Sequence, residues 1–354
     1  MRITVLGCGN AGSAVAGDLA HKGHDVILCK TSDKMHTEHF KTMYSNQKVS
    51  LIENGHEESY KITVTQDVEH VIAGRDLIII YIQTNYHKQL IQRISPLLED
   101  GQMVLIEPGY LSSCFFLQYC KKDITLIEAE SSPIDCRIVE PGRIKVLFRN
   151  VRNPLGVFPQ NRTTQVIEAL KSLDYSFEPL NSVAEAALHN PNLIVHTVGA
   201  ILSIPRIEYV QAHGGSYSMY KEVFTPNVWR LAMQLDREKM DVLSSLGCKR
   251  IPYVEACKYR NSLDDDRDAE EVFFDYALNS APDGPFTPDS RYLTEDVPQG
   301  LVLLESLGIA HDIETPVCTS LINIASALLG RDFRAEGRTI DILGRECIKR
   351  LLTR

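Results

Sequence analysis

The sequence predicts an α/β fold in which a doubly wound sheet domain is followed by an all-α C-terminal domain. Three observations predict it. A glycine-rich turn joins a strand to a helix at the start of the chain, apolar strands alternate with helical patterns up to about residue 180, and long helical patterns with few strands follow. We place the domains at residues 1–182 and 183–354, a length that allows each a core of its own.

The first element is a short strand that begins at Arg2 and contains the apolar residues Ile3, Val5 and Leu6, and a G-x-G-x-x-G turn follows it directly. The three glycines of such a turn provide a tight bend, room for a pyrophosphate against bare backbone, and close packing of helix on strand. Residues 13–21 continue at helical spacing, and the helix N-terminus offers N–H groups to phosphate. The motif predicts a Rossmann-type dinucleotide site. Its cofactor-binding residues are Gly7, Gly9, Asn10, Ala11 and Gly12.

The second strand, residues 24–30, ends at Lys30, and Thr31 and Ser32 follow it. A site selective for NAD usually has an acidic residue here for the ribose hydroxyls, whereas a cation accommodates a 2′-phosphate. The first carboxylate is Asp33, one position beyond the two hydroxyls. The pattern favours NADP(H) over NAD(H), and the alternative is an ordinary solvated strand end.

The remaining elements follow from periodicity and length. In the first domain we expect further strands at residues 76–83, 102–106, 125–129, 144–148 and 155–158, and helices at 88–98 and 163–173. The polar stretch between Lys30 and Asp76 has room for a hairpin. In the second domain we expect helices at residues 183–202, 226–246, 268–279, 301–307 and 314–329.

Composition excludes several classes of protein. The net charge is −9 without a long basic run, which argues against nucleic acid and anionic membranes as partners. The nine cysteines are scattered and form no C-x-x-C pair, so neither a disulfide framework nor a zinc or other metal site is expected. A strand that begins at Arg2 leaves no room for a signal peptide, and apolar runs such as Leu77–Ile82 are too short to span a bilayer. We expect a cytoplasmic protein.

One histidine stands out as a candidate for acid–base chemistry. His196 lies among Leu193, Val195 and Val198 at the start of the helical half, so apolar neighbours shield it from water. Histidine suits proton transfer because its pKa lies near neutrality. With Pro191 in the first turn of a helix, the side chains of Asn192 and His196 share one face. The alternative is a buried histidine that only packs in the core.

A second unusual segment, RYLTEDVPQGL, occupies residues 291–301. Glu295 and Asp296 precede Pro298, where acidic residues complement the dipole of a following helix. A carboxylate at this place could instead orient a histidine and stabilise its protonated form. From the residues alone, both interpretations of Asp296 stay open.

With these segments the chain resembles the octopine/nopaline dehydrogenases, the opine dehydrogenase family, over nearly its whole length. The most specific of the shared patterns is the RYLTEDVPQGL segment. The others are GCGNAG at residues 7–12, Glu128 with Pro133, Cys136 and Arg137, and Asn192 with His196. One departure is Thr197, since several family members have proline after the histidine.

The resemblance implies the chemistry. It implies an NAD(P)H-dependent opine dehydrogenase in which an amino acid condenses with a 2-oxo acid, pyruvate by default, and the resulting C=N bond is reduced. His196 would then be the general acid–base catalyst, Asp296 would orient it, and Asn192 would hold the oxo acid. Cations must hold the substrate carboxylates, and the candidates are Arg291, Arg206 and Arg230. The apolar C-terminal helices predict a homodimer.

Two alternative functions remain open. A two-domain ketopantoate reductase, glycerol-3-phosphate dehydrogenase or hydroxyacid dehydrogenase generally has a lysine as acid near the start of the helical domain, and none occurs between Leu173 and Lys221. A redox sensor that binds NADP(H) without catalysis has no need of a buried histidine–carboxylate pair. Proximity of His196 to Asp296 therefore discriminates between an enzyme and a sensor.

Overall fold

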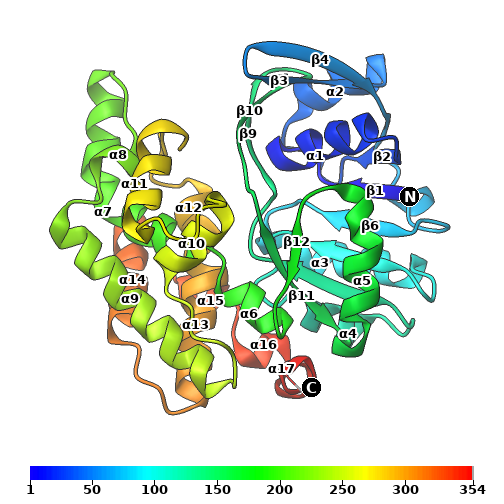
Figure 1. The fold of residues 1–354 in the computed structure, drawn as a ribbon. Coiled ribbons are helices and arrows are strands. Elements are labelled where there is room, and N and C mark those ends of the chain that lie inside the picture. Colours follow the sequence, from blue (N-terminus) through cyan, green and yellow to red (C-terminus); the bar gives the residue numbers. More distant parts are fainter. Residues whose placement is uncertain (353–354) are drawn as a thin grey trace. The chain divides into compact units, whose positions relative to one another are not determined.

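The computed structural model describes residues 1–352, and the chain divides into two compact units, Met1–Val183 and Ala184–Arg354 (Figure 1). The first unit is an α/β domain with a mixed sheet and the second is helical, which confirms the predicted fold class.

The first unit is built on an eight-stranded sheet in the order β12-β11-β8-β7-β6-β1-β2-β5. Neighbouring strands are parallel except β11, which runs antiparallel to β8. Val5 of the central strand lies opposite Leu28 on one side and Ile79 on the other. The strands are β1 (Arg2–Leu6), β2 (Asp25–Cys29), β5 (Thr63–Thr65), β6 (Leu77–Ile80), β7 (Met103–Ile106), β8 (Thr125–Ala129), β11 (Asn153–Phe158) and β12 (Phe177–Pro179).

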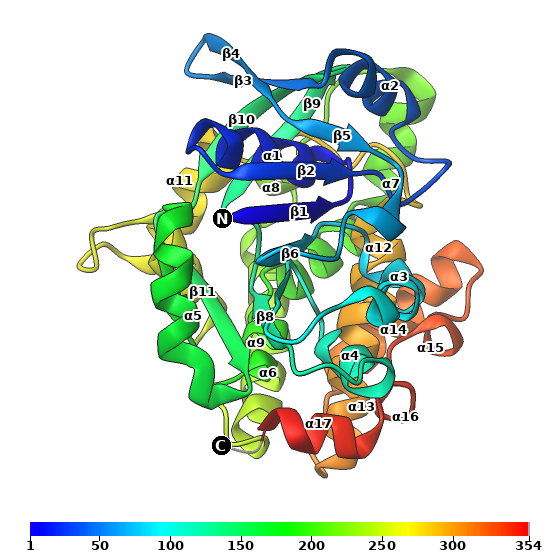
Figure 2. The same cartoon turned by 90° about the vertical axis from the view of Figure 1, so that its right-hand side faces the viewer.

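The chain order reverses at β1, because β2 lies on one side of it and β6 on the other (Figure 2). In open α/β sheets this switch point opens a crevice at the carboxyl ends of the strands, where ligands bind. The helices of this unit are α1 (Asn10–His21), α2 (Thr37–Asn46), α3 (His87–Ile94), α4 (Ser113–Tyr119) and α5 (Thr163–Leu170). Short 3-10 turns occur at Val68–His70, Thr84–Tyr86, Ser95–Leu97, Gln160–Arg162 and Lys171–Leu173.

Helix α1 packs on one side against the eight-stranded sheet, and a second sheet of four strands covers its other side (Figure 1). Its order is β4 (His56–Lys61), β3 (Lys48–Glu53), β10 (Arg143–Arg149) and β9 (Ile134–Glu140). Gly17 of α1 permits the close approach, because a Cβ there would lie 2.7 Å from the Val49 side chain. Strands β3 and β4 form a hairpin in the polar stretch after Lys30, whereas β9 has no counterpart among the strands that periodicity predicted.

The second unit contains the long helices α7 (Asn192–His213), α9 (Pro226–Ser245) and α14 (Pro316–Leu329). The shorter helices are α6 (Val183–Leu188), α8 (Met219–Glu222), α10 (Tyr253–Asn261), α11 (Ala269–Asn279), α12 (Arg291–Thr294), α13 (Val302–Ala310), α15 (Phe333–Glu336), α16 (Ile340–Leu343) and α17 (Arg345–Leu352). A π-helical turn, Val297–Leu301, connects α12 to α13.

The single helix expected at residues 183–202 is instead two helices, and this expectation was wrong in its bounds. The helix is interrupted between α6 and α7, because Pro191 has no N–H to continue the helical hydrogen bonds. The Asn190 side chain accepts the N–H of Asn192, the first residue of α7, at 3.0 Å. The second helix then continues to His213, past Pro205.

The stretch Val183–His213 is long and apolar enough, by length and composition, to cross a membrane. Within its most apolar window, 72% is buried inside the protein, as in the core helix of a soluble domain.

Candidate functional site

The glycine-rich turn after β1 is shaped by close backbone contacts. A Cβ at Gly7 would lie 2.2 Å from the Tyr81 carbonyl oxygen, and one at Gly12 would lie 2.0 Å from the Gly7 carbonyl oxygen. Gly9 differs, because the nearest atom to a Cβ there is the His36 Nε2 at 3.4 Å. Only glycine fits the first and third positions, while Gly9 leaves bare backbone just before α1. This is the cradle that a pyrophosphate requires, so these residues fit a bound dinucleotide.

Asn10 has a structural contact in addition. Its side-chain oxygen accepts the N–H of Ile138 at 2.7 Å, which ties the first turn of α1 to β9. Asn10 and Ala11 therefore begin a helix whose N-terminal backbone is fixed against the smaller sheet.

The residues predicted to choose the cofactor lie in the turn after β2. Lys30 is buried, its ammonium donates to the Ser32 carbonyl, and Nζ lies 5.6 Å from the centroid of the Phe40 ring. The Ser32 hydroxyl in turn accepts the N–H of Lys34 at 3.2 Å. Lys30, Thr31 and Ser32 thus form one compact turn, with the cationic group at the carboxyl end of the strand.

Two histidines near this turn were not singled out from the sequence. The His36 ring lies beside Gly9, and His36 has a positive φ of 52°. His39 is buried, and its Nε2 lies 3.1 Å from the Ser13 hydroxyl. Its Nδ1 accepts the N–H of Gly142 at 2.9 Å, so this nitrogen carries no proton. Burial and the nearby His36 lower the pKa of His39 to about 4.

Glu128, from the pattern shared with the resembling family, supports the carboxyl edge of the sheet. Its carboxylate accepts the N–H of Leu111 at 3.0 Å and that of Ser113 at 2.7 Å. A Cβ at Gly109 would meet this carboxylate at 2.0 Å. Glu128 therefore fixes the start of α4. Of the other residues in the pattern, Cys136 and Arg137 lie in β9, and Pro133 precedes that strand.

The structure brings His196 and Asp296 together in the helical unit. His196 Nδ1 lies 2.8 Å from Asp296 Oδ2, and the two residues are 5% and 2% exposed. They are one hundred positions apart in the chain, His196 on α7 and Asp296 between α12 and the π-helical turn. A carboxylate that accepts Nδ1–H fixes the tautomer in which Nε2 is the basic nitrogen. Asn192 lies one turn before His196 at the start of α7.

Tyr292 completes the surroundings of this histidine. Its ring stacks on the His196 imidazole with centroids 3.6 Å apart and planes 6° apart. Tyr292 belongs to the same shared segment as Asp296, but spacing alone gives no reason to pair its ring with a histidine on another helix. Thr197, the departure from the resembling family, is buried and donates its hydroxyl to the Leu193 carbonyl at 2.6 Å.

The three arginine candidates are placed differently. Arg291 lies on α12 with Tyr292, and its guanidinium is 3.5 Å from the Glu295 carboxylate. Arg206 pairs with Glu222 at 3.0 Å. Arg206 lies ten positions after His196 on α7, about 15 Å along the helix axis. The third candidate, Arg230, is exposed on α9 and bonds to Asn227 in its own helix.

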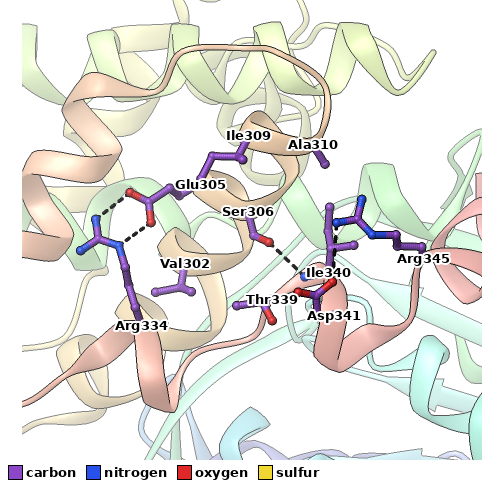
Figure 3. Close-up of a pocket in the computed structure, with 10 residues that line it drawn as sticks. All are labelled: Val302, Glu305, Ser306, Ile309, Ala310, Arg334, Thr339, Ile340, Asp341 and Arg345. Atoms are coloured by element: carbon purple, nitrogen blue, oxygen red, sulfur yellow. Dashed lines mark hydrogen bonds and ion pairs between the residues drawn. The ribbon is translucent and has the colours of Figure 1, made fainter.

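A pocket of about 210 Å³ also lies in the helical unit, between α13 and the segment from α15 to α17 (Figure 3). Its charged groups neutralise one another, since Arg334 pairs with Glu305 and Arg345 lies 3.6 Å from Asp341. None of the predicted site residues lines it.

All nine cysteines are free thiols. Within residues 1–352 no group of three or more histidine, cysteine, aspartate or glutamate side chains is placed to hold a metal ion.

Comparisons with known proteins find similar dehydrogenase families for both parts of the chain. Residues 179–329 match the family profile "NAD/NADP octopine/nopaline dehydrogenase, alpha-helical domain", and residues 2–108 match "NAD-dependent glycerol-3-phosphate dehydrogenase N-terminus". The opine dehydrogenase of Arthrobacter sp. (strain 1C) is 25% identical over 348 residues, which cover 96% of this chain and 94% of the relative.

Solved structures of similar fold cover nearly the whole chain. An octopine dehydrogenase with NADH and L-arginine superposes with a TM-score of 0.76 at 19% identity, covering 99% of this chain and 97% of that one. An NADP+-bound yersinopine dehydrogenase gives a TM-score of 0.70 at 17% identity, with coverage of 99% and 97%.

Proposed function

We propose that the chain is a member of the octopine/nopaline dehydrogenase family and an opine dehydrogenase that joins an amino acid to a 2-oxo acid. As an NAD(P)-dependent oxidoreductase acting on CH–NH groups, it reduces the C=N bond of the condensed imine and oxidises the opine in reverse. The observation that carries this proposal is the buried pair of His196 and Asp296, 2.8 Å apart.

In the first unit, Gly7, Gly9 and Gly12 with the start of α1 hold the pyrophosphate of the cofactor. When bound, the reduced nicotinamide supplies the hydride. The helical unit supplies the residues for the substrates, and this division of labour is the role we propose for residues 1–182 and 183–354.

His196 moves the proton. With Nδ1–H donated to Asp296, the Nε2 nitrogen takes up or gives a proton at the reacting centre, and the Asp296 carboxylate stabilises the imidazolium. Burial of both groups strengthens this interaction, because water screens it little. Asn192, one turn earlier, donates a hydrogen bond to the oxo acid. A protein that only senses redox state by binding NADP(H) would not require this buried histidine–carboxylate pair.

Cations bind the substrate carboxylates, and Arg291 is the first candidate because it shares α12 and the shared segment with Tyr292. The Arg291 side chain is 47% exposed although it lies 3.5 Å from the buried Glu295 carboxylate, so a substrate carboxylate can reach it without displacing Glu295. Arg206 and Arg230 rank behind it, since the former lies about 15 Å along α7 from His196 and the latter is exposed on α9.

We further propose that NADP(H) is preferred over NAD(H). Lys30 at the end of β2 and the hydroxyls of Thr31 and Ser32 suit a 2′-phosphate, and the ammonium can exchange the Ser32 carbonyl for a phosphate oxygen. A yersinopine dehydrogenase of similar fold was solved with NADP+.

A homodimer in the cytoplasm completes the proposal. Exposed apolar side chains on C-terminal helices, among them Ile309, Ile324 and Leu328, support self-association. Nine free thiols fit a reducing compartment.

The test is oxidation of NADPH and NADH with 2-oxo acids, pyruvate first, crossed against a panel of amino acids. We expect turnover only when an oxo acid and an amine are both present. Turnover with the oxo acid alone would indicate a simple ketoreductase, and tight cofactor binding without turnover would favour the sensor.

A further inference from the structure

The His196 imidazole is held on two sides by residues of one short segment. Asp296 accepts from the ring edge at Nδ1, and Tyr292 covers a ring face with its own ring nearly parallel to the imidazole. The proposed function assigns a role to the hydrogen bond with Asp296 but none to the stacked Tyr292 ring. Tyr292 is 8% exposed, so the stacked face is closed to water.

The two contacts restrain different motions. A single hydrogen bond to a carboxylate fixes Nδ1 but lets the imidazole tilt about the bond axis. A parallel ring at a centroid distance of 3.6 Å removes that tilt, because tilting would bring the ring edges into collision. Together the two contacts fix the direction of Nε2.

The stack has an electrostatic consequence as well. The face of a tyrosine ring carries negative charge density, so it attracts an imidazolium more strongly than a neutral imidazole. This effect adds to that of the Asp296 carboxylate, and both favour the protonated ring.

Other charged groups on the elements packed against α7 have partners of their own, apart from Lys221 of α8, which is exposed. On α12 and just after it, Arg291 pairs with Glu295. The remaining ones are Glu222 of α8 with Arg206, Asp236 of α9 with Lys239, Asp241 with Arg250, Glu238 with the backbone N–H groups of Val317 and Cys318, Arg230 with Asn227, and Arg237 with Gln234.

We propose that Tyr292 is a positioning residue for the acid–base histidine: it fixes the plane of the His196 ring and stabilises its protonated form through the stacked face. The kinetic part of this inference rests on the proposed function, whereas the titration of His196 does not.

Two variants separate the ring from its hydroxyl. Tyr292→Phe keeps the stacked ring, and Tyr292→Leu removes it while filling most of the space. Tyr220→Leu is the matched control, because Tyr220 is also 8% exposed in the helical unit but packs on Phe224 and Tyr276. If circular dichroism shows that Tyr292→Leu does not fold, Tyr292→Met replaces it.

The first readout is the titration of the His196 ring in the protein without substrates, followed by NMR with labelled histidine and assigned with a His196→Gln variant. We expect Tyr292→Leu to lower the midpoint by about 0.5 to 1 pH unit, the equivalent of a stacked pair. Tyr292→Phe and Tyr220→Leu should retain the wild-type midpoint. A wild-type midpoint in Tyr292→Leu would overturn the proposal.

The second readout is the pH profile of imine reduction. In Tyr292→Leu, kcat should fall by about threefold to tenfold, and the decline towards high pH should begin earlier, with the affinity for NADPH unchanged. Equal losses in Tyr292→Phe and Tyr292→Leu would overturn the proposal by assigning the effect to the hydroxyl. If no opine forms with any protein but the midpoint still shifts, the positioning role stands and the proposed function fails.

Discussion

At the scale of single residues, the site depends on one histidine whose carboxylate partner and stacked ring both come from a distant part of the chain. His196 lies on α7, and both Asp296 and Tyr292 come from a segment about one hundred residues later. The chemistry proposed for His196 needs a proton at a defined nitrogen, and the hydrogen bond at 2.8 Å defines it.

Replacement of His196 by glutamine should remove the proton donor and keep most of the volume. We expect kcat to fall by about 10² to 10⁴ while the affinity for NADPH stays within about twofold of wild type. Steady-state kinetics and fluorescence titration of NADPH measure the two quantities. An equal loss of cofactor affinity would mean that His196 is structural.

Asp296→Asn should leave the fold intact and allow the wrong tautomer of the histidine. The expected loss in kcat is about 10² or more, with little change in the KM for the oxo acid. The double variant with His196→Gln serves as the control, because residues that act as a unit show losses that do not add. Additive losses would contradict a functional pair.

Lys30→Asp should reverse the charge offered to the 2′-phosphate. We expect the ratio of kcat/KM for NADPH over NADH to fall by about tenfold or more, since a charged hydrogen bond is lost and a repulsion is gained. Lys34→Asp, the same change in charge at an exposed residue of the same turn, is the matched control. An unchanged ratio in Lys30→Asp would refute the phosphate site.

At the scale of elements, the glycines of the turn between β1 and α1 are required for different reasons, some by the fold and one by the ligand. The first and third glycines are required by the fold, because a Cβ at Gly12 would lie 2.0 Å from a carbonyl oxygen. At Gly9 the nearest atom lies 3.4 Å from a Cβ, and the backbone φ of −90° suits any residue.

Gly9→Ala should therefore keep the melting temperature and weaken the cofactor, whereas Gly12→Ala should lower both. We expect an affinity for NADPH about tenfold or more lower in Gly9→Ala, because the methyl group occupies the approach of the pyrophosphate. Thermal unfolding and cofactor titration distinguish the two effects. Wild-type affinity in Gly9→Ala would place the phosphates elsewhere.

The buried His39 of α2, which contacts Ser13 of α1, makes the first unit sensitive to acid. The pKa of His39 is about 4 in the fold and 6.5 when unfolded, so its contribution to stability is complete above pH 6.5 and is lost as the pH falls towards 4. The loss amounts to about 3 kcal/mol.

His39→Asn retains an acceptor for the Gly142 N–H and does not titrate there. The free energy of unfolding of this variant should change less between pH 7 and pH 4.5 than that of wild type. His56→Asn, at an exposed histidine of the same unit, should behave as wild type. Parallel pH dependence in His39→Asn and wild type would contradict this account.

At the scale of the whole molecule, periodicity and the glycine motif were sufficient to predict an α/β domain followed by a helical one. They missed β9, whose alternating pattern is only partly buried because it faces α1 on one side. They also predicted one helix at residues 183–202, because helical periodicity continues across Asn190 and Pro191 where the chain breaks.

The candidate site was predictable only in part. The residues of the glycine turn are local in sequence, so a motif identifies them. The pairing of His196 with Asp296 depends on contact between distant helices, and family resemblance suggested it where spacing could not. The stacking of Tyr292 on His196 and the positions of His36 and His39 could not be predicted from the sequence, because a linear pattern does not indicate which side chains meet in the fold.

The central claim is that this chain reduces an imine formed from an amino acid and a 2-oxo acid, with His196 as the acid–base group. The most direct measurement is a mass spectrum of the product formed from deuterium-labelled NADPH, an oxo acid and an amino acid, with wild type and His196→Gln side by side. The account predicts a secondary amine that contains both substrates, with deuterium on the former carbonyl carbon, and almost none of it from the variant. Deuterium in a free 2-hydroxy acid, or equal product from the variant, would contradict the account.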